Sequence, residues 1–175
     1  MIGYWQRDVM NNGDRLDNKI KPVADAQSPL LQEVHAYWRA KCGDRAMPAR
    51  ADLDPIDIPA LLPNLILIDV IPPSGRLRVR LVGTWIVNQF GRDYTGRYLD
   101  EIDFGEAQDE IVREYSAAAA AARPVCSDHR YRNLGGQIYD IERLILPLSE
   151  DGERVSMLLI VLDFTERSAS PPRQF

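Results

Sequence analysis

Cysteine, histidine and long apolar runs are all scarce in this chain. Its 175 residues include two cysteines, Cys42 and Cys126, and two histidines. Because the cysteines are isolated and no CxxC pair or histidine cluster accompanies them, neither a disulfide framework nor a zinc site is indicated. The longest apolar stretches, within 65–71 and 157–162, are too short to span a bilayer, and the N-terminus lacks the apolar stretch of a signal peptide. A reduced, cytoplasmic setting is the simplest expectation.

Runs of like charge are missing as well. The net charge is -5, and the arginines are scattered without forming a basic run. This argues against nonspecific binding to nucleic acid or to an anionic membrane surface. With 45% apolar and 27% charged residues, the composition is that of a globular domain, and the length suffices for one hydrophobic core.

The N-terminal quarter divides into a leader and a helix. Residues 1–27 are polar and irregular, so a flexible leader is expected. Ser28 and Pro29 form the pattern of an N-cap followed by proline, and apolar residues then recur at helical spacing up to Gly43, so the sequence predicts a helix over 29–42. The apolar stripe of this helix consists of Leu30, Leu31, Val34, Tyr37 and Trp38. It can cover its own sheet, pair with the same stripe of a second chain, or do both; its two large aromatics favour a dimer interface.

The remaining sequence predicts strands at both ends and helices between them. Five strands are predicted, over 65–70, 76–82, 125–133, 137–147 and 154–164, with hairpin turns at 72–75, 134–136 and 149–152. Short helices are predicted within 83–104 and a long helix over 106–123, which contains six consecutive alanines. This order predicts an α+β domain around a single antiparallel sheet.

Two of these strands are apolar at nearly every position, namely 65–70 and 155–162. In an antiparallel sheet such a pattern requires that both faces are covered. The helices between the second and third strands can cover one face. The N-terminal helix, or a second subunit, must then cover the other.

The end of the chain has the pattern of a signalling junction. Asp163 comes directly after an apolar strand and is followed three residues later by Glu166. This spacing is typical of the start of a helix. Pro171 and Pro172 would stop such a helix almost at once. We therefore expect any output to be delivered to another molecule, with Asp163, Thr165 and Glu166 forming the junction.

These elements occur in the order of the PAS domain family, which the chain resembles. Two segments are most similar: FGRDYTG at 90–96 resembles the family's "FGY…G" segment, and DFTER at 163–167 resembles its terminal Asp-Ile-Thr-Glu-Arg/Lys junction, with Phe164 in place of Ile. The run 47–65 is similar to short, PAS-only bacterial proteins whose activity is largely unknown. The resemblance covers roughly residues 29–167 and implies a PAS-like domain with a five-stranded antiparallel sheet. The chain is thus expected to consist of the leader over 1–27, this domain over 28–167 and a tail over 168–175.

The resemblance also implies a function. PAS domains are sensory or protein-interaction modules, often dimeric through a helix N-terminal to the core, with a pocket that holds haem, flavin, a small metabolite or nothing. We expect a non-enzymatic regulatory module that acts in trans on an unidentified signalling protein, forms a homodimer and responds to a small ligand; the cofactor is left unassigned. The alternative is a stand-alone receptor for a small molecule or haem. The aromatic residues of this region are more simply explained as a filled core than as the lining of a cavity. If a pocket exists, the residues predicted to line it are Trp85, Asn88, Phe90, Tyr94, Tyr115, His129 and Tyr139.

Specific cofactors find limited support. The light-sensing flavin subfamily requires a reactive cysteine just before the long helix, and the segment 100–104 has none. Haem in PAS sensors commonly binds a histidine on the long helix, whereas 106–123 contains none. His129, on a predicted strand, is the weaker candidate for haem.

Catalytic and metal chemistry are supported less well. Ser127, Asp128 and His129 are the residue types of a hydrolase triad, but on a strand Asp128 faces away from the other two. A group of three aspartates is more simply explained by helix capping than by a hard cation: Asp52, Asp54 and Asp57. No glycine-rich loop with lysine follows a strand, so phosphate binding is not predicted.

Overall fold

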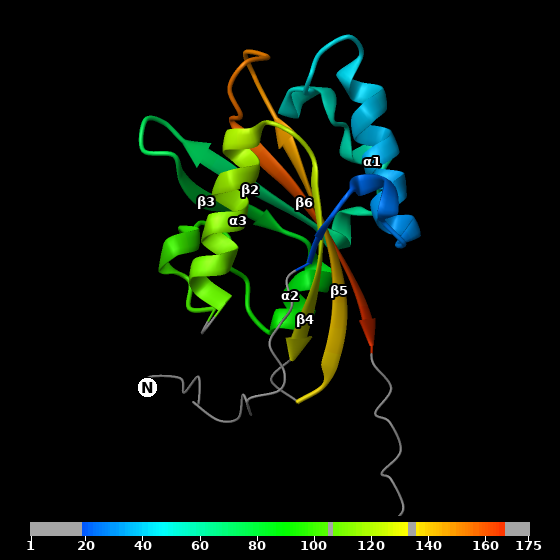
Figure 1. The fold of residues 1–175 in the computed structure, drawn as a ribbon, viewed down its shortest axis with the longest axis vertical. Coiled ribbons are helices and arrows are strands. Elements are labelled where there is room, and N and C mark those ends of the chain that lie inside the picture. Colours follow the sequence, from blue (N-terminus) through cyan, green and yellow to red (C-terminus); the bar gives the residue numbers. More distant parts are fainter. Residues whose placement is uncertain (1–18, 105–106, 133–135, 167–175) are drawn as a thin grey trace, which may run out of the picture.

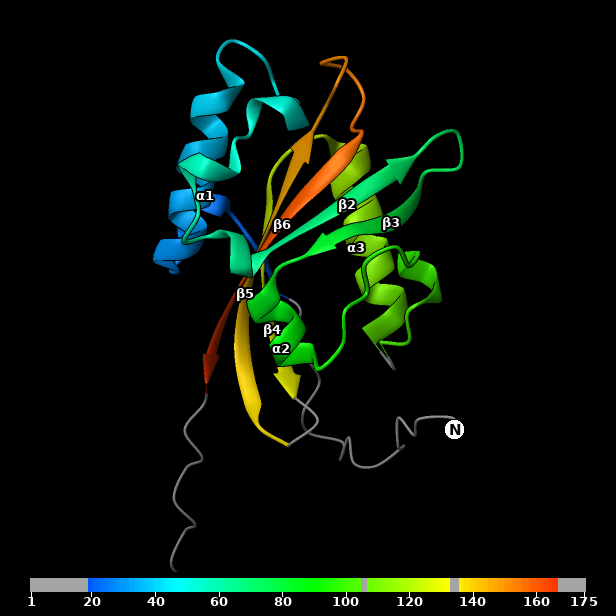
Figure 2. The same ribbon diagram turned by 180° about the vertical axis from the view of Figure 1, so that it is seen from behind.

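The computed structural model describes residues 19–104, 107–132 and 136–166. It is built around one antiparallel sheet in the order β1-β4-β5-β6-β2-β3, with helices on both faces (Figures 1 and 2). The strands are β1 Lys19–Lys21, β2 Leu65–Ile71, β3 Arg76–Val82, β4 Val125–Arg132, β5 Ile138–Leu148 and β6 Met157–Glu166. The α-helices are α1 Pro29–Cys42, α2 Thr84–Phe90 and α3 Gln108–Ala121. Short 3-10 helices are η1 Val23–Asp25, η2 Arg50–Asp52, η3 Pro55–Asp57, η4 Leu62–Asn64 and η5 Leu99–Glu101.

Helix α1 covers what we call the outer face of the sheet. Ser28 caps it, because its Oγ accepts a hydrogen bond from the Leu31 N–H at 3.3 Å. Leu31, Val34 and Trp38 are at most 1% exposed, and the Trp38 indole N–H donates to the Pro147 carbonyl at 2.9 Å. These three side chains fill the chain's own core and are not accessible to a second chain in this structure; the predicted homodimer stays a prediction. Leu30 and Tyr37 pack partly buried against the same core.

The opposite, inner face is covered by α2, η5 and α3 (Figure 1). Strand β6 lies between β5 and β2 and alternates between the two cores: Leu158 and Ile160 pack on the inner face, and Leu159 and Val161 on the outer face. The continuous apolar pattern of this strand therefore reflects burial on both sides, as the sequence predicts.

The sheet has six strands rather than the expected five, because β1 comes from the segment predicted to be a leader. Lys19 to Lys21 pair with Asp128 to Cys126 at the edge of β4. Lys21 forms ion pairs with Asp128 and Glu142, which explains how so polar a segment joins a sheet. Ala26, in the same predicted leader, is buried. Residues 1–18 lie outside the described part of the chain.

The predicted junction has a different structure from the one expected. Strand β6 continues to Glu166, where it pairs with Tyr139 of β5. Asp163 and Thr165 are therefore strand residues, and the Asp163 carboxylate accepts a hydrogen bond from the Ser28 hydroxyl at 2.6 Å instead of capping a following helix. The tail 168–175 and most of the expected turn at 134–136 lie outside the described residues.

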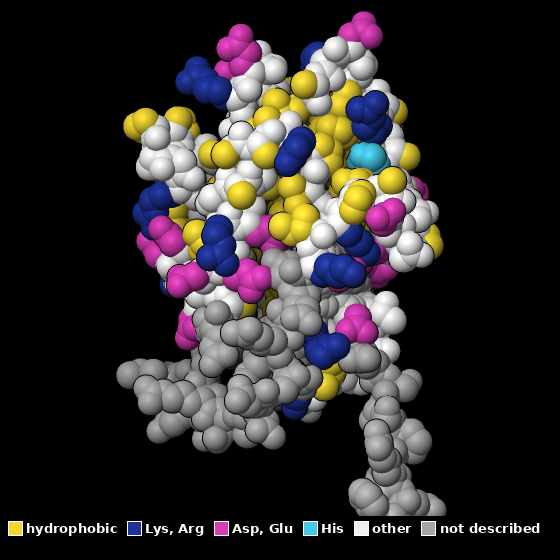
Figure 3. All heavy atoms as spheres, viewed as in Figure 1, with side chains coloured by type: hydrophobic (Ala, Val, Ile, Leu, Met, Phe, Trp, Pro, Cys, Tyr) yellow, Lys and Arg dark blue, Asp and Glu magenta, His cyan; other side chains and the backbone are white. Residues whose placement is uncertain are grey.

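The distribution of surface charge and the character of the helices both bear on function. On the face shown in Figure 3, basic and acidic side chains are interspersed, with no large region of one sign. Among the helices that the structure describes, none has the length and apolar character needed to cross a bilayer.

Candidate functional site

Five aromatic rings gather on the inner face of the sheet around Phe164 of β6. The ring centroid of Phe164 lies 4.9 Å from Trp85 and 5.9 Å from Phe90, both on α2. Tyr131 of β4 and Tyr139 of β5 approach it at 6.2 and 6.1 Å. The rings meet edge-to-face or tilted, which is the favourable arrangement for aromatic pairs. These five residues, the aromatic cluster, fill the space between α2 and the sheet.

The aromatic cluster contains three of the predicted pocket residues: Trp85, Phe90 and Tyr139. Tyr94 packs against Phe104, with 5.9 Å between the ring centroids. Asn88 is exposed on α2 and takes no part in the cluster. The last two predicted residues, Tyr115 and His129, belong to a separate polar group further along the sheet.

That polar group is built around a buried ion pair between α3 and β5. Arg143 Nη2 pairs with Glu114 Oε2, and the two side chains are 6% and 5% exposed. Glu114 Oε1 also accepts a hydrogen bond from the Ser127 hydroxyl at 2.8 Å. The Arg143 guanidinium lies 4.9 Å from the centroid of the Tyr115 ring, and its Nη1 donates to the Tyr115 hydroxyl at 3.4 Å. These residues and His129 form the buried ionic cluster.

His129, on β4, is the last member of this cluster and contacts Ser127 of the same strand. Its Nε2 lies 2.9 Å from Ser127 Oγ. Because the Ser127 hydroxyl donates to Glu114, the ring nitrogen must donate to Ser127, which assigns the Nε2–H tautomer. Burial, reinforced by the nearby positive charge of Arg143, lowers the pKa of His129 to about 2. His129 is therefore neutral throughout the physiological range.

The cluster does not have the arrangement of a hydrolase triad. Asp128 faces the outer side of the sheet, where its Oδ1 accepts from Lys21 Nζ at 2.7 Å. The carboxylate that reaches Ser127 is Glu114, and it binds the serine rather than orienting the histidine. Ser127 is fully buried, so its hydroxyl cannot meet a substrate in this structure.

His129 predicts a pH dependence of stability. Its pKa in the folded protein lies below the ordinary value, so below about pH 6.5 the unfolded chain binds a proton that the folded chain does not. The free energy of unfolding should be independent of this group above pH 6.5 and fall by up to about 1.4 kcal/mol per pH unit below it. Urea unfolding between pH 7.5 and 5, above the range where carboxylates titrate, measures this slope.

A His129→Gln variant should flatten the slope between pH 6.5 and 5. His35 is the control, because burial also lowers its pKa. His35→Gln should remove only the part of the pH dependence that His129 does not cause. An unchanged slope in His129→Gln would contradict the assignment.

Sequence reasoning missed several members of these clusters, although a signal was present. Tyr131 follows His129 by two residues, so the two side chains lie on the same face of the strand, the inner one. Arg143 interrupts the otherwise apolar inner face of its strand, which also carries Tyr139, Ile141 and Ile145, and a buried arginine requires a carboxylate partner. Nothing in the sequence, however, indicated which of the acidic residues on the long helix would be that partner.

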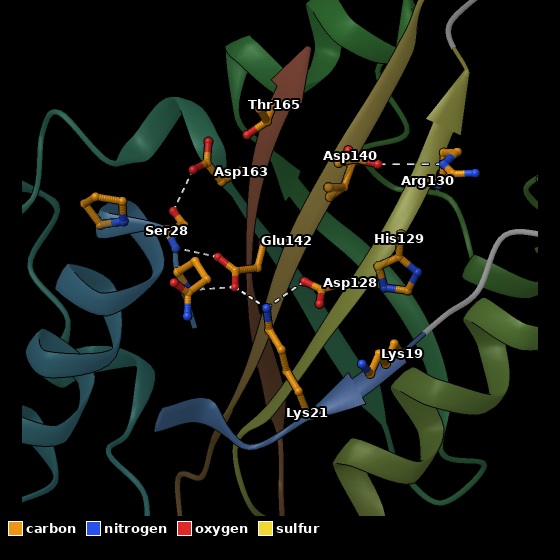
Figure 4. Close-up of a pocket in the computed structure, with 13 residues that line it drawn as sticks. Lys19, Lys21, Ser28, Asp128, His129, Arg130, Asp140, Glu142, Asp163 and Thr165 are labelled. Carbon is orange, nitrogen blue, oxygen red and sulfur yellow. Dashed lines mark hydrogen bonds and ion pairs between the residues drawn. The ribbon is translucent and has the colours of Figure 1, made fainter. Parts of the chain in front are cut away.

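On the outer face, a groove of about 590 Å³ lies between the segment that precedes α1 and strands β4, β5 and β6 (Figure 4). Glu142 holds this segment in place: its carboxylate accepts from the Gln27 and Ser28 N–H groups at 2.8 and 2.6 Å and pairs with Lys21. Although burial favours the neutral acid, these hydrogen bonds lower the pKa of Glu142. With the Asp163–Ser28 bond, two strands therefore fix the start of α1. We call this cavity the outer groove.

Side chains with exposed polar atoms line the rest of the outer groove. Figure 4 shows Asp140 and Thr165 on its sheet side, together with Arg130 of β4. Arg130 Nε and Asp140 Oδ1 are 3.7 Å apart, a loose ion pair across β4 and β5. Charged side chains of both signs therefore line the outer groove.

Metal and thiol chemistry have no assembled site in the part of the chain that the structure describes. No group of three or more metal-ligating side chains is found there. The three aspartates considered above bind separate partners: Asp52 accepts from the Ala49 N–H, Asp54 from the Ile56 N–H, and Asp57 pairs with Lys41. Cys42 and Cys126 both belong to the outer core, away from the aromatic cluster.

The chain belongs to the PAS domain family, whose model matches residues 26–162. It is accordingly a sensory or regulatory module. No curated protein matches the chain. Solved structures with a similar fold include the Rhodobacter sphaeroides LOV protein, at 15% identity and a TM-score of 0.48, covering 66% of this chain and 70% of that one.

Two further structures are similar at a comparable level. The light-state Aureochrome1 LOV structure has 11% identity and a TM-score of 0.47, covering 62% of this chain and 86% of that chain. The LOV domain of the Erythrobacter litoralis EL346 blue-light activated histidine kinase has 13% identity and a TM-score of 0.46, covering 59% and 95%. The family assignment rests on the match over residues 26–162.

Proposed function

We propose that this PAS domain is a non-enzymatic regulatory module that acts in trans, by binding a partner protein at the outer groove. The observation that carries the proposal is the contrast between the two faces of the sheet. On the inner face, the aromatic cluster and the buried ionic cluster occupy the space beside α2 and α3. On the outer face, the groove of about 590 Å³ lies open beside the strand that carries the predicted junction.

The predicted junction supports this location. Thr165 lines the outer groove, and Asp163 contacts the N-cap of α1. A partner that displaces Ser28 or Gln27 from their carboxylate acceptors would change the position of α1 on the sheet. A binding event at the groove can therefore be transmitted to the α1 helix. A homodimer, also part of this proposal, would have to use surfaces other than the buried side chains of Leu31, Val34 and Trp38.

Site-specific crosslinking tests the proposal. A photoreactive amino acid replaces Thr165 in the groove, and a matched chain carries it at Glu153, which is exposed in the β5–β6 connection at the other end of β6. We expect a defined crosslinked protein in an extract of the source organism from position 165 and none from position 153. Adding Asp140→Arg should abolish that product. Equal labelling at both positions, or none at 165, would reject groove-mediated partner binding.

A second candidate function, the small-molecule receptor, is favoured by one observation. Arg143 is 5% exposed, and its Nε has no hydrogen-bond partner among the described residues. A buried donor of this kind can be satisfied by a small polar ligand or by water. Haem is supported less well, because the Nε2 of His129 is engaged by Ser127.

Native mass spectrometry and an absorbance scan of the purified protein separate the two functions. A retained mass that disappears in Arg143→Met, or a haem or flavin band, would favour the receptor. A ligand-free mass together with groove-dependent crosslinking would favour the partner-binding module.

A further inference from the structure

Three carboxylates form a row across the outer face of the sheet. Asp128 of β4, Glu142 of β5 and Asp163 of β6 lie directly opposite one another in the strand register, and all three line the outer groove (Figure 4). Like charges at directly opposed positions of neighbouring strands repel each other. These three residues, which we call the carboxylate row, therefore require compensation from outside their own strands.

The compensation comes from the segment that precedes α1, residues 19–28, which we call the strap. Lys21 Nζ forms ion pairs with the first two carboxylates of the row. The Ser28 N–H donates to the second carboxylate at 2.6 Å, and the Ser28 hydroxyl donates to the third at 2.6 Å. Every member of the carboxylate row thus binds the strap. In these contacts one positive charge meets three negative charges, so negative charge remains in excess.

Apolar burial contributes little to holding the strap. Strand β1 has three residues, and its Ile20 is 65% exposed. Ala26 is buried, and Val23 packs partly buried against the outer core. A segment with few buried apolar contacts opens at a lower free energy than the core strands and helices do. The strap is therefore a part of the outer face that a competing segment can replace.

We propose that the carboxylate row is the recognition element of the outer groove and binds a basic segment of the partner protein in exchange for the strap. The strap itself shows the chemistry that the row accepts, because its Lys21 ammonium reaches two carboxylates and Ser28 donates to the other positions. The excess negative charge favours a partner segment with more positive charge than the strap. The inference rests on the proposed partner binding and specifies the chemistry of the partner.

A peptide experiment on the full chain tests this exchange. The probe is a fluorescent peptide that copies residues 19–28, and the control peptide has glutamate in place of Lys21. We expect anisotropy to show roughly tenfold tighter binding of the probe to the Lys21→Ala chain, whose own strap is weakened, than to the unmodified chain. The control peptide should bind neither chain. Lys41→Ala, which removes a lysine that pairs with Asp57, should bind the probe like the unmodified chain.

Alkylation of the two cysteines measures whether the strap leaves the sheet. Cys126 is fully buried and lies opposite Lys21 in the β1–β4 register, whereas Cys42 is buried at the end of α1. Iodoacetamide should label Cys126 roughly tenfold faster in Lys21→Ala than in the unmodified chain, with Cys42 unchanged, and the probe should restore protection. If both cysteines react faster, Lys21→Ala has unfolded the domain; Asp128→Asn, which removes one ion pair only, then replaces it with the same expectation.

Three results would overturn the proposal. One is a probe that binds no better after the strap is weakened, and another is a control peptide that binds as well as the probe. The third is Cys126 remaining protected in both variants. Failure of the proposed function is distinguishable, because it would remove the crosslink from position 165 altogether. If only the exchange were wrong, that crosslink would persist and excess probe would not compete with it.

Discussion

Replacing Glu114 by glutamine is expected to lower the free energy of unfolding by about 3 kcal/mol, the lower end of the range for breaking a buried ion pair. The substitution keeps the size of the side chain but leaves the Arg143 charge buried without a counter-ion. It also weakens the acceptor of the Ser127 hydrogen bond. Urea unfolding at pH 7.5 measures the change. The matched control is Asp109→Asn, on the exposed side of the same helix, which should change stability by less than about 0.5 kcal/mol.

Replacing both partners tests the reason for this loss. A chain with Glu114→Leu and Arg143→Met has no buried charge at this position. It should therefore recover most of the stability, since paired apolar replacements of buried ion pairs are often neutral. If the double variant is less stable than Glu114→Gln, the ion pair has a net stabilising role of its own. That outcome would contradict the view that the cost arises from an uncompensated charge.

The second large effect is expected at Phe164. Because its ring touches four other aromatic rings and is 9% exposed, Phe164→Ala should cost about 3–5 kcal/mol through lost contacts and a residual cavity. Phe164→Leu is the matched control, with a smaller loss because most of the volume is kept. Thermal and urea unfolding of both variants measure the difference.

The Phe164→Ala variant also tests whether the aromatic cluster is a filled core. An apolar cavity inside a domain can bind a small aromatic molecule. We expect indole to raise the melting temperature of Phe164→Ala and to leave that of the unmodified chain unchanged. An equal response of both proteins would show that the unmodified domain already has a cavity there, and would favour the receptor function.

Much of the candidate site followed from local patterns. The strands predicted at 125–133 and 137–147 placed His129 and Tyr139 within the sheet. Trp85 and Phe90, predicted as pocket residues, pack on its inner face. Asn88, also predicted as a pocket residue, lies on the exposed side of α2. The Glu114–Arg143 pair was missed because its partners are 29 positions apart, and spacing along the chain cannot show which carboxylate reaches a given arginine.

By itself the sequence determined the class of this protein. Hydrophobic periodicity, the Ser28–Pro29 helix start and the order of strands and helices depend on local chemistry, and they sufficed to predict an α+β domain around one antiparallel sheet. The PAS family was suggested by resemblance, which the segments 90–96 and 163–167 carry. Tertiary structure alone decided the roles of Lys21, Asp163 and Glu142. Lys21 joins the sheet because two acidic residues from other strands neutralise its charge. Asp163 binds Ser28 rather than starting a helix, because β5 extends β6 by pairing with it as far as Glu166. Such choices depend on which distant groups the fold brings within hydrogen-bonding distance.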